Sequence, residues 1–268
     1  MRRRLAWPRR PAHPAPEAAA RPLLLGHRGH RRPAWGEREN TLPAFDHALR
    51  LGCDGVELDL HLSADGRIVV HHDAELSVPR PGGGRPHKEP LAATSLRTLR
   101  RLQPELATLD DVLRRYRHSA WMDLEIKSAA VAPALPALLQ RWPLERGYVV
   151  SSFDPAALAP LAQANAAGAG IPLCLNLRRP CSRRRLQLLR RSLGLTWVAP
   201  HVSGCTGWYL RRLLRADWQV LVWTVNRPAK MRMLARAGVQ AICSDDPEVL
   251  VEVLGPGAPG PPAGPPPA

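Results

Sequence analysis

Short apolar runs alternate with amphipathic helical patterns along nearly the whole chain, and this alternation limits the fold more than any other feature of the sequence. Repeated strand–helix units build a parallel sheet with helices packed against it. About eight such units in about 230 residues fit a closed (β/α)8 barrel better than an open, doubly wound sheet. We therefore predict an α/β fold, a single TIM-type barrel domain with disordered termini. Strands are expected at residues 23–25, 56–60, 68–70, 121–126, 148–150, 173–177, 197–199, 220–225 and 241–243. Helices are expected at residues 40–51, 96–102, 109–116, 156–166, 183–193, 207–214 and 229–237.

Two details of this pattern do not fit a simple barrel. Nine runs resemble strands, whereas the fold needs eight. The link between Leu60 and Ile68 is also too short for the helical crossover that joins parallel strands. The pairing of residues 68–70 is therefore left open.

The two ends of the chain differ in composition from its centre. Residues 1–21 are rich in Pro, Ala and Arg, and residues 255–268 contain only Gly, Pro and Ala. Such segments bury too little apolar surface to fold. We expect a disordered basic arm at 1–21, the barrel domain at 22–254 and a disordered tail at 255–268. Within the barrel, the stretch Pro79–Pro90 with its three consecutive glycines predicts a surface loop.

The formal net charge of +15 raises the question of a nucleic-acid or membrane-surface binder. Six arginines and one acid give residues 1–21 a charge of +5, and ten arginines without any acid give residues 155–216 a charge of +10. These two segments account for the whole excess. Because such a basic arm or helix face can be only a solvated surface, we expect no specific nucleic-acid partner. Attraction to anionic surfaces or substrates is a secondary role that the arginines could serve.

Other classes are excluded by what the sequence lacks. The sequence contains no apolar run of about 18 residues, so no transmembrane segment is predicted. The basic N-terminus is not followed by the apolar region of a secretory signal, so we expect a cytoplasmic protein. The five cysteines are scattered without the spacing of a zinc site or a disulfide framework.

Polar residues interrupt or follow four of the expected strands. Side chains two residues apart in a strand point to the same face, so the carboxylates of Glu57 and Asp59 share one side. A barrel gathers the C-terminal ends of its strands around one mouth, where these groups would meet. They are His27 and Arg28, Glu57 and Asp59, His72 and Asp73, and Glu125 and Lys127.

Each of these residue types suits one task in phosphoryl transfer. The carboxylates of Glu57, Asp59 and Glu125 are hard oxygen ligands that favour Mg²⁺ or Ca²⁺ over zinc. The cations of Arg28 and Lys127 suit a phosphate. Two histidines, His27 and His72, can act as acid and base near neutral pH. Taken singly, a histidine here could be structural and the acid pair Glu57 and Asp59 could form a salt-bridged interior, but the whole set favours hydrolysis of a phosphate ester.

Taken in order, the motifs of this chain closely resemble those of the glycerophosphodiester phosphodiesterase family. The resemblance covers residues 23–252, and the order of the motifs is far more specific than any one of them. The motifs are His27-Arg28-Gly29, Arg38-Glu39-Asn40-Thr41, Gly55-Val56-Glu57-Leu58-Asp59, Val69-Val70-His71-His72-Asp73, Leu124-Glu125-Ile126-Lys127, Ser151-Ser152-Phe153, Val222-Trp223-Thr224-Val225-Asn226 and Ser244-Asp245.

The resemblance implies a TIM barrel that uses a divalent cation to hydrolyse small glycerophosphodiesters to an alcohol and glycerol 3-phosphate. It implies that His27 and His72 are the acid–base pair and that Glu57, Asp59 and Glu125 hold the metal, either Mg²⁺ or Ca²⁺. It further implies that the phosphate and substrate are bound by Arg28, Lys127, Glu39 (a further metal ligand or substrate contact) and Trp223.

Several choices stay open within this interpretation. Arg38 stands where the family often has Pro, and the loop at Pro79–Pro90 is short, so the leaving alcohol is not specified. A lysophospholipase D activity on the same barrel is the alternative, and a nucleic-acid or anionic-membrane binding protein is a third. The attacking group could be water or the glycerol 2-hydroxyl, either histidine could be the base, and the oligomeric state is open.

Overall fold

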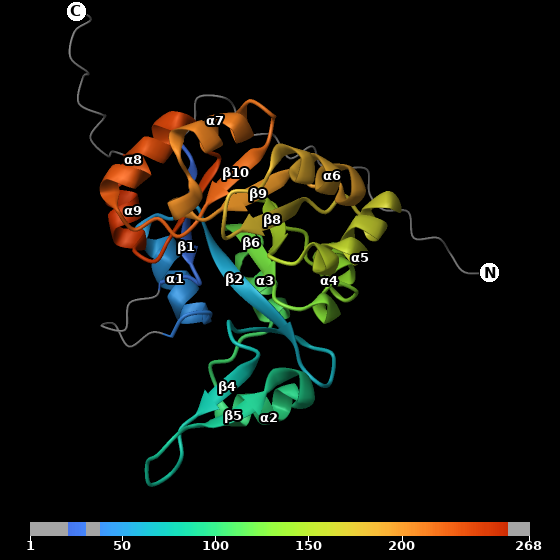
Figure 1. Ribbon diagram of the computed structural model, residues 1–268. Coiled ribbons are helices and arrows are strands. Elements are labelled where there is room, and N and C mark those ends of the chain that lie inside the picture. The colour runs from blue at the N-terminus through green and yellow to red at the C-terminus, as the bar shows by residue number, and fades with distance from the viewer. Residues whose placement is uncertain (1–20, 31–37, 257–268) are drawn as a thin grey trace, which may run out of the picture.

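The computed structural model describes residues 21–30 and 38–256, and eight of its strands close into a parallel barrel (Figure 1). Strand β1 pairs in parallel with both β2 and β11, which closes the sheet on itself. The expected TIM-type barrel is therefore confirmed. The segments expected to be disordered, 1–21 and 255–268, lie outside the described residues except for residues 21, 255 and 256. The barrel strands are β1 (Leu23–His27), β2 (Gly55–Leu62), β6 (Trp121–Ile126), β7 (Tyr148–Ser152), β8 (Leu173–Leu177), β9 (Trp197–Pro200), β10 (Gln219–Val222) and β11 (Ala241–Ser244).

Helices cover the outside of the barrel and bury its outward-facing residues (Figure 1). Several begin at a side-chain cap: Thr108 and Asp111 form a capping box, and Ser182 accepts from Arg185 N–H. Two helices, α4 and α9, were not expected from the sequence, which shows no clear apolar period there. The outer helices are α1 (Leu42–Leu51), α3 (Leu109–Tyr116), α4 (Leu135–Arg141), α5 (Pro155–Ala166), α6 (Arg183–Leu193), α7 (Gly207–Leu214), α8 (Pro228–Ala237) and α9 (Pro247–Leu254), with 3-10 turns at Leu91–Ala93, Ala129–Val131 and Val202–Gly204.

The ninth expected strand, β3 (Ile68–Val70), is not a barrel strand. It folds back on the end of β2 as an antiparallel hairpin, with Leu60 opposite Val70 and Leu62 opposite Ile68. A hairpin needs only a short turn, which explains why the link after Leu60 is too short for a crossover.

A second hairpin projects from the barrel after β3 (Figure 1). Its strands β4 (Glu75–Val78) and β5 (His87–Pro90) are antiparallel, and helix α2 (Leu96–Leu102) follows them. The expected surface loop at Pro79–Pro90 is thus shorter than predicted, because its last residues pair with β4. The hairpin is anchored by Leu76, which packs with Leu91 and Leu99 in a small separate core.

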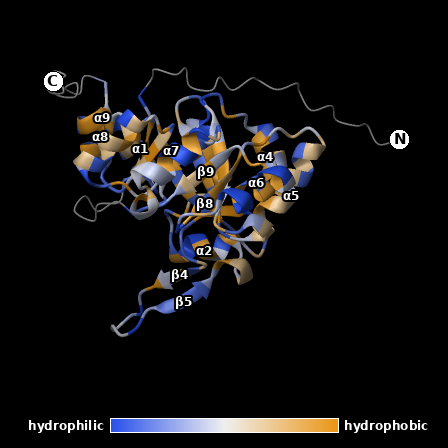
Figure 2. Cartoon of the chain, turned by 45° about the horizontal axis from the view of Figure 1, so that its top comes forward, coloured by the Kyte–Doolittle hydropathy of each residue, from blue (hydrophilic) through white to orange (hydrophobic). Residues whose placement is uncertain are grey.

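The interior of the barrel is filled by large side chains near the start of the strands. Trp121 and Trp197 lie with their ring centroids 5.7 Å apart among aliphatic residues of β1, β7 and β10. Gly55 allows this packing, since a Cβ there would overlap the backbone carbonyl of Trp121. Figure 2 shows apolar residues along the strands and inner helix faces, with polar residues on the outer turns. The polar side chains of the barrel interior lie at the C-terminal ends of the strands.

Candidate active site

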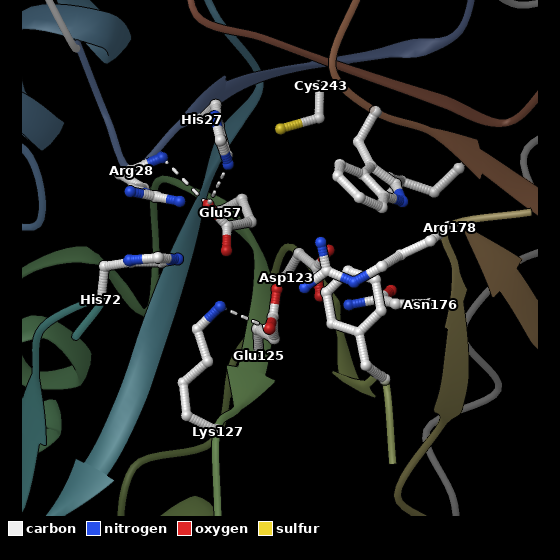
Figure 3. A pocket seen from close by; sticks show the side chains of 13 residues that line it. His27, Arg28, Glu57, His72, Asp123, Glu125, Lys127, Asn176, Arg178 and Cys243 are labelled. Carbon is white, nitrogen blue, oxygen red and sulfur yellow. Dashed lines mark hydrogen bonds and ion pairs between the residues drawn. The ribbon is translucent and has the colours of Figure 1, made fainter. Parts of the chain in front are cut away.

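A cavity opens at the C-terminal ends of the barrel strands, and most of the predicted site residues line it (Figure 3). Glu39 and Asp59 stand behind this lining, where both pair with Arg28. The structure thus brings together all nine residues that the sequence singled out. The lining residues are His27, Arg28, Glu57, His72, Asp123, Glu125, Lys127, Phe153, Asn176, Arg178, Leu221, Trp223 and Cys243.

Three buried carboxylates form the centre of the site. Glu57 and Asp59 come from β2 and Glu125 from β6, and the register places Asp59 opposite Glu125. One oxygen from each lies within 4.8 Å of the others. The strand periodicity explains this cluster, because all three side chains point into the barrel.

Two cations balance the carboxylates. The Lys127 ammonium lies 2.8 Å from Asp59 Oδ1 and 2.5 Å from Glu125 Oε1. The Arg28 guanidinium lies 2.6 Å from Glu39 and 3.1 Å from Asp59 Oδ2. Both cations also line the cavity, so each has a carboxylate on one side and the open space on the other.

The turn after β1 adds a backbone contact to this cluster. Arg28 adopts a left-handed conformation with φ of 56°, and Gly29 follows with φ of 83°. In this turn the Arg28 backbone N–H donates to Glu57 Oε2 at 3.0 Å (Figure 3). A side chain at Gly29 would also collide with Ala44, which explains the glycine in the His27-Arg28-Gly29 motif.

Burial and neighbouring charge push the pKa values of the three carboxyls in different directions. Burial and the nearby Asp59 and Glu125 hold the pKa of Glu57 well above its ordinary value. Burial also raises the pKa of Glu125, although Lys127 opposes it. Burial disfavours ionised Asp59 as well, but Lys127 and Arg28 outweigh it and lower the Asp59 pKa.

This cluster has the chemistry of a site for a divalent cation. Its donors are hard carboxylate oxygens, and the buried Glu57 Oε1 has no hydrogen-bond partner among residues 21–30 and 38–256. A bound cation would provide that partner and would stabilise the ionised form of Glu57. The residues present therefore fit a divalent metal. Carboxylate oxygens suit both Mg²⁺ and Ca²⁺.

The two histidines extend into the same cavity (Figure 3), and an aspartate contacts the Nδ1 atom of each. His27 Nδ1 lies 2.6 Å from Asp245, and its Nε2 lies 3.8 Å from Glu57 Oε2. His72 Nδ1 lies 2.8 Å from Asp73, and the His72 side chain is 39% exposed. Burial lowers the pKa of His72 despite the nearby Asp59. An aspartate on Nδ1 orients the ring and leaves Nε2 for proton transfer.

An aromatic wall forms the opposite side of the cavity. Trp223 donates through its indole N–H to the Ala199 carbonyl at 2.7 Å and packs edge-to-face on Phe153, with centroids 5.2 Å apart. The guanidinium of Arg178 lies 4.3 Å from the centre of the Phe153 ring. This wall suits the carbon skeleton of a ligand whose charged part lies at the carboxylates.

Several residues of the site were not singled out from the sequence. Asp245 follows β11, where the sequence offered the signal of a polar residue at a strand end, and Asn226 donates to it at 2.9 Å. Asn40 donates to Asp59 at 2.7 Å from a left-handed position before α1. Arg178 directly follows β8, but only the closed barrel places it beside Phe153.

Asp123 is a further buried acid. It lies two residues before Glu125 and on the same face of β6. Burial raises its pKa to about 7, although the Ser151 hydroxyl favours the ionised form. Its Oδ1 atom has no hydrogen-bond partner within the part of the chain that the structure describes. The barrel interior therefore favours a neutral acid here.

We expect Asp123→Asn to stabilise the metal-free protein at high pH. Since the carboxyl pKa rises from 3.8 to about 7 on folding, the wild type loses stability as the pH rises through this range. The variant avoids that loss, so its free energy of unfolding should exceed that of the wild type by about 4 kcal/mol at a pH of about 8. The difference should vanish at a pH of about 3. Urea unfolding in chelator at the two pH values measures it, and equal stabilities at the higher pH would contradict the prediction.

A (β/α)8 barrel with buried acids, two histidines and two cations at its mouth is typical of a hydrolase of the phosphodiesterase class. Comparison with known proteins identifies the family. Residues 27–249 match the model of the glycerophosphoryl diester phosphodiesterase family, so the chain belongs to that family.

Individual relatives agree with this assignment. A glycerophosphodiester phosphodiesterase of Caldanaerobacter subterraneus is 27% identical over 250 residues, which cover 87% of this chain and 97% of that protein. A phosphodiesterase of Oleispira antarctica, solved in complex with the product sn-glycerol-3-phosphate, is 25% identical with a TM-score of 0.71, covering 87% of this chain and 96% of that one. A shorter segment of 54 residues is 48% identical to a lysophospholipase D of Rattus norvegicus, covering 20% of this chain and 17% of that protein. No helix among the described residues is long and apolar enough to cross a membrane.

Proposed function

We propose that this enzyme hydrolyses small glycerophosphodiesters to an alcohol and sn-glycerol 3-phosphate, using a divalent cation and the histidines His27 and His72. The observation that carries the proposal is the shared cavity. Two aspartate-held histidines border a carboxylate cluster that has two cations at its edge. The product bound to the related Oleispira antarctica enzyme supports the same substrate class.

The carboxylates Glu57, Asp59 and Glu125 would hold the metal. When bound, a divalent cation polarises a phosphoryl oxygen and neutralises charge that develops on the phosphate. Arg28 and Lys127 would hold the other phosphate oxygens, because both line the cavity and are fixed in place by carboxylates. Glu39 would act mainly through Arg28, which it contacts at 2.6 Å.

The histidines would move the two protons of the reaction. One ring accepts the proton of the attacking hydroxyl through its Nε2 atom, and the other donates a proton to the oxygen of the departing alcohol. Asp245 and Asp73 would keep both rings in the required orientation. The attacking hydroxyl is that of water or of the glycerol 2-position. Attack by the 2-hydroxyl releases the alcohol and leaves a cyclic phosphate, which water must then open to give glycerol 3-phosphate, with a second pair of proton transfers.

The aromatic wall would receive the rest of the substrate. Phe153 and Trp223 offer apolar faces to a glycerol backbone or a leaving alcohol, and Arg178 brings a positive charge to the same wall. This wall, together with the short similarity to a lysophospholipase D, supports a second candidate activity, release of an alcohol from lysophospholipids.

A substrate panel tests the proposal and separates the two candidates. We expect hydrolysis of glycerophosphodiesters with release of glycerol 3-phosphate, detected by a coupled dehydrogenase, and a lower kcat/KM for lysophosphatidylcholine than for glycerophosphocholine. A glycerophosphodiester whose leaving alcohol carries a negative charge should be preferred over the choline ester, because the Arg178 cation repels the quaternary ammonium group of choline. A preference for lysophosphatidylcholine would favour the second candidate, and no turnover of any diester would contradict both.

A further inference from the structure

A group of arginines, all exposed except the half-buried Arg212, lies with one exposed tryptophan after β8 and β9, on the side of α6 and α7. Trp208 is 64% exposed, more than any other large apolar side chain that the structure describes. Arg178 and Arg179 directly follow β8, and Arg183 and Trp208 lie in the first turns of α6 and α7, so these four lie at the face where the cavity opens. Arg211 and Arg212 lie in the second turn of the short helix α7, next to Trp208 along the helix. We call the group the rim patch; it consists of Arg178, Arg179, Arg183, Trp208, Arg211 and Arg212.

The rim patch is one continuous surface that reaches into the cavity. Arg178 lines the cavity and lies over Phe153. Three residues later, the Cys181 carbonyl accepts a hydrogen bond from Arg212 at 2.5 Å, which ties the loop after β8 to α7. The guanidinium of Arg212 lies 4.8 Å from the centre of the Trp208 ring.

The positive charge of this surface is not arranged for helix stability. No acid occurs in residues 155–216. Helix α6 begins with three arginines, Arg183 to Arg185, and has no acid in its first turn. Cations at a helix N-terminus oppose the positive end of the helix dipole. An anionic partner would offset this unfavourable arrangement, and Figure 2 shows the strongly polar turns of α6 on the outside of the barrel.

We propose that the rim patch docks on an anionic phospholipid bilayer. The arginines would meet the phosphates and carboxylates of the lipid headgroups, and the Trp208 ring would enter the headgroup region. A tryptophan beside arginines fits this boundary because one end of the ring is apolar and the other is polar. A duplex nucleic acid would use the arginines alone. Docking goes beyond the proposed hydrolysis, and the two can fail independently.

The test is co-sedimentation of the full chain with vesicles of phosphatidylcholine alone or mixed with phosphatidylserine, at low and moderate salt. We expect binding only to the anionic vesicles, with the affinity falling as salt rises. The triple variant Arg179→Gln, Arg183→Gln, Arg211→Gln should bind about 100-fold more weakly, since each headgroup-contacting arginine contributes about fivefold. Trp208→Ala should weaken vesicle binding and should reduce the quenching of the protein's tryptophan fluorescence by brominated lipid.

A matched control removes the same charge elsewhere. The variant Arg97→Gln, Arg101→Gln, Arg236→Gln changes three exposed arginines on α2 and α8, and should bind within about twofold of the wild type. Turnover of soluble glycerophosphocholine should be unchanged in both triple variants, which separates docking from hydrolysis. Equal loss of binding in the two variants, or binding to neutral vesicles alone, would overturn the proposal. The proposal would also be overturned if the rim triple variant lost binding to duplex DNA and Trp208→Ala bound vesicles as well as the wild type.

Discussion

Replacing His27 or His72 with alanine is expected to lower kcat for glycerophosphodiester hydrolysis by about 100-fold or more. Each ring is oriented by an aspartate, at 2.6 Å for His27 and 2.8 Å for His72, and each lines the cavity beside the carboxylate cluster. Loss of either ring removes one of the two proton transfers that the reaction needs. Steady-state kinetics with glycerophosphocholine measure the change.

His71 offers a matched control for this experiment. It is the neighbour of His72, but its Nδ1 atom lies 2.9 Å from the Asp73 carbonyl and it does not line the cavity. We expect His71→Ala to retain turnover within about threefold of the wild type, since it takes no part in proton transfer. Unchanged turnover in His27→Ala or His72→Ala would remove that residue from the mechanism. A loss in His71→Ala equal to that in His72→Ala would point to a structural effect on the loop.

Removing the divalent cation is the second change with a large expected effect. Treatment with a chelator should reduce turnover by at least about 100-fold, and added Mg²⁺ or Ca²⁺ should restore it. Glu57→Gln should have a similar effect that added metal does not reverse, because Glu57 is a proposed ligand whose buried Oε1 finds no hydrogen-bond partner among the described residues. Turnover in a metal titration measures both.

Stability measurements distinguish loss of the metal from loss of the fold. Because burial and neighbouring acids raise the pKa of Glu57, its ionised form destabilises the metal-free protein as the pH rises. Metal-free Glu57→Gln should therefore be at least as stable as the wild type at neutral pH, and added cation should raise the thermal stability of the wild type but not that of Glu57→Gln. Asp123→Asn is the matched control, since it removes a buried acid from the same wall outside the ligand set. Full activity in chelator would contradict the metal site.

The elements with strong local signals were predicted closely from the sequence. Strands β3, β6 and β8 and helices α2, α3, α6 and α7 have the bounds that their apolar patterns indicate. Helices α4 and α9 and hairpin β4–β5 were missed. Helix α4 has few polar residues to show a period, and the hairpin exposes most side chains and is held by backbone hydrogen bonds and the buried Leu76. Local patterns report which face of an element is buried, and these segments carry little such information.

The chemical types of the site residues, and the side of the strand to which they point, are properties of the sequence alone. The alternation of strand side chains already places Glu57 with Asp59 and Glu125 with Lys127 on shared faces. The tertiary structure decided which of these groups meet: closure of the barrel between β1 and β11 brings Asp245 to His27, although 218 positions separate them. The same closure makes Arg178 part of the cavity wall and gathers the dispersed arginines beside Trp208. Contacts between distant segments depend on how the sheet closes and on the register of its strands, and no local pattern encodes either quantity.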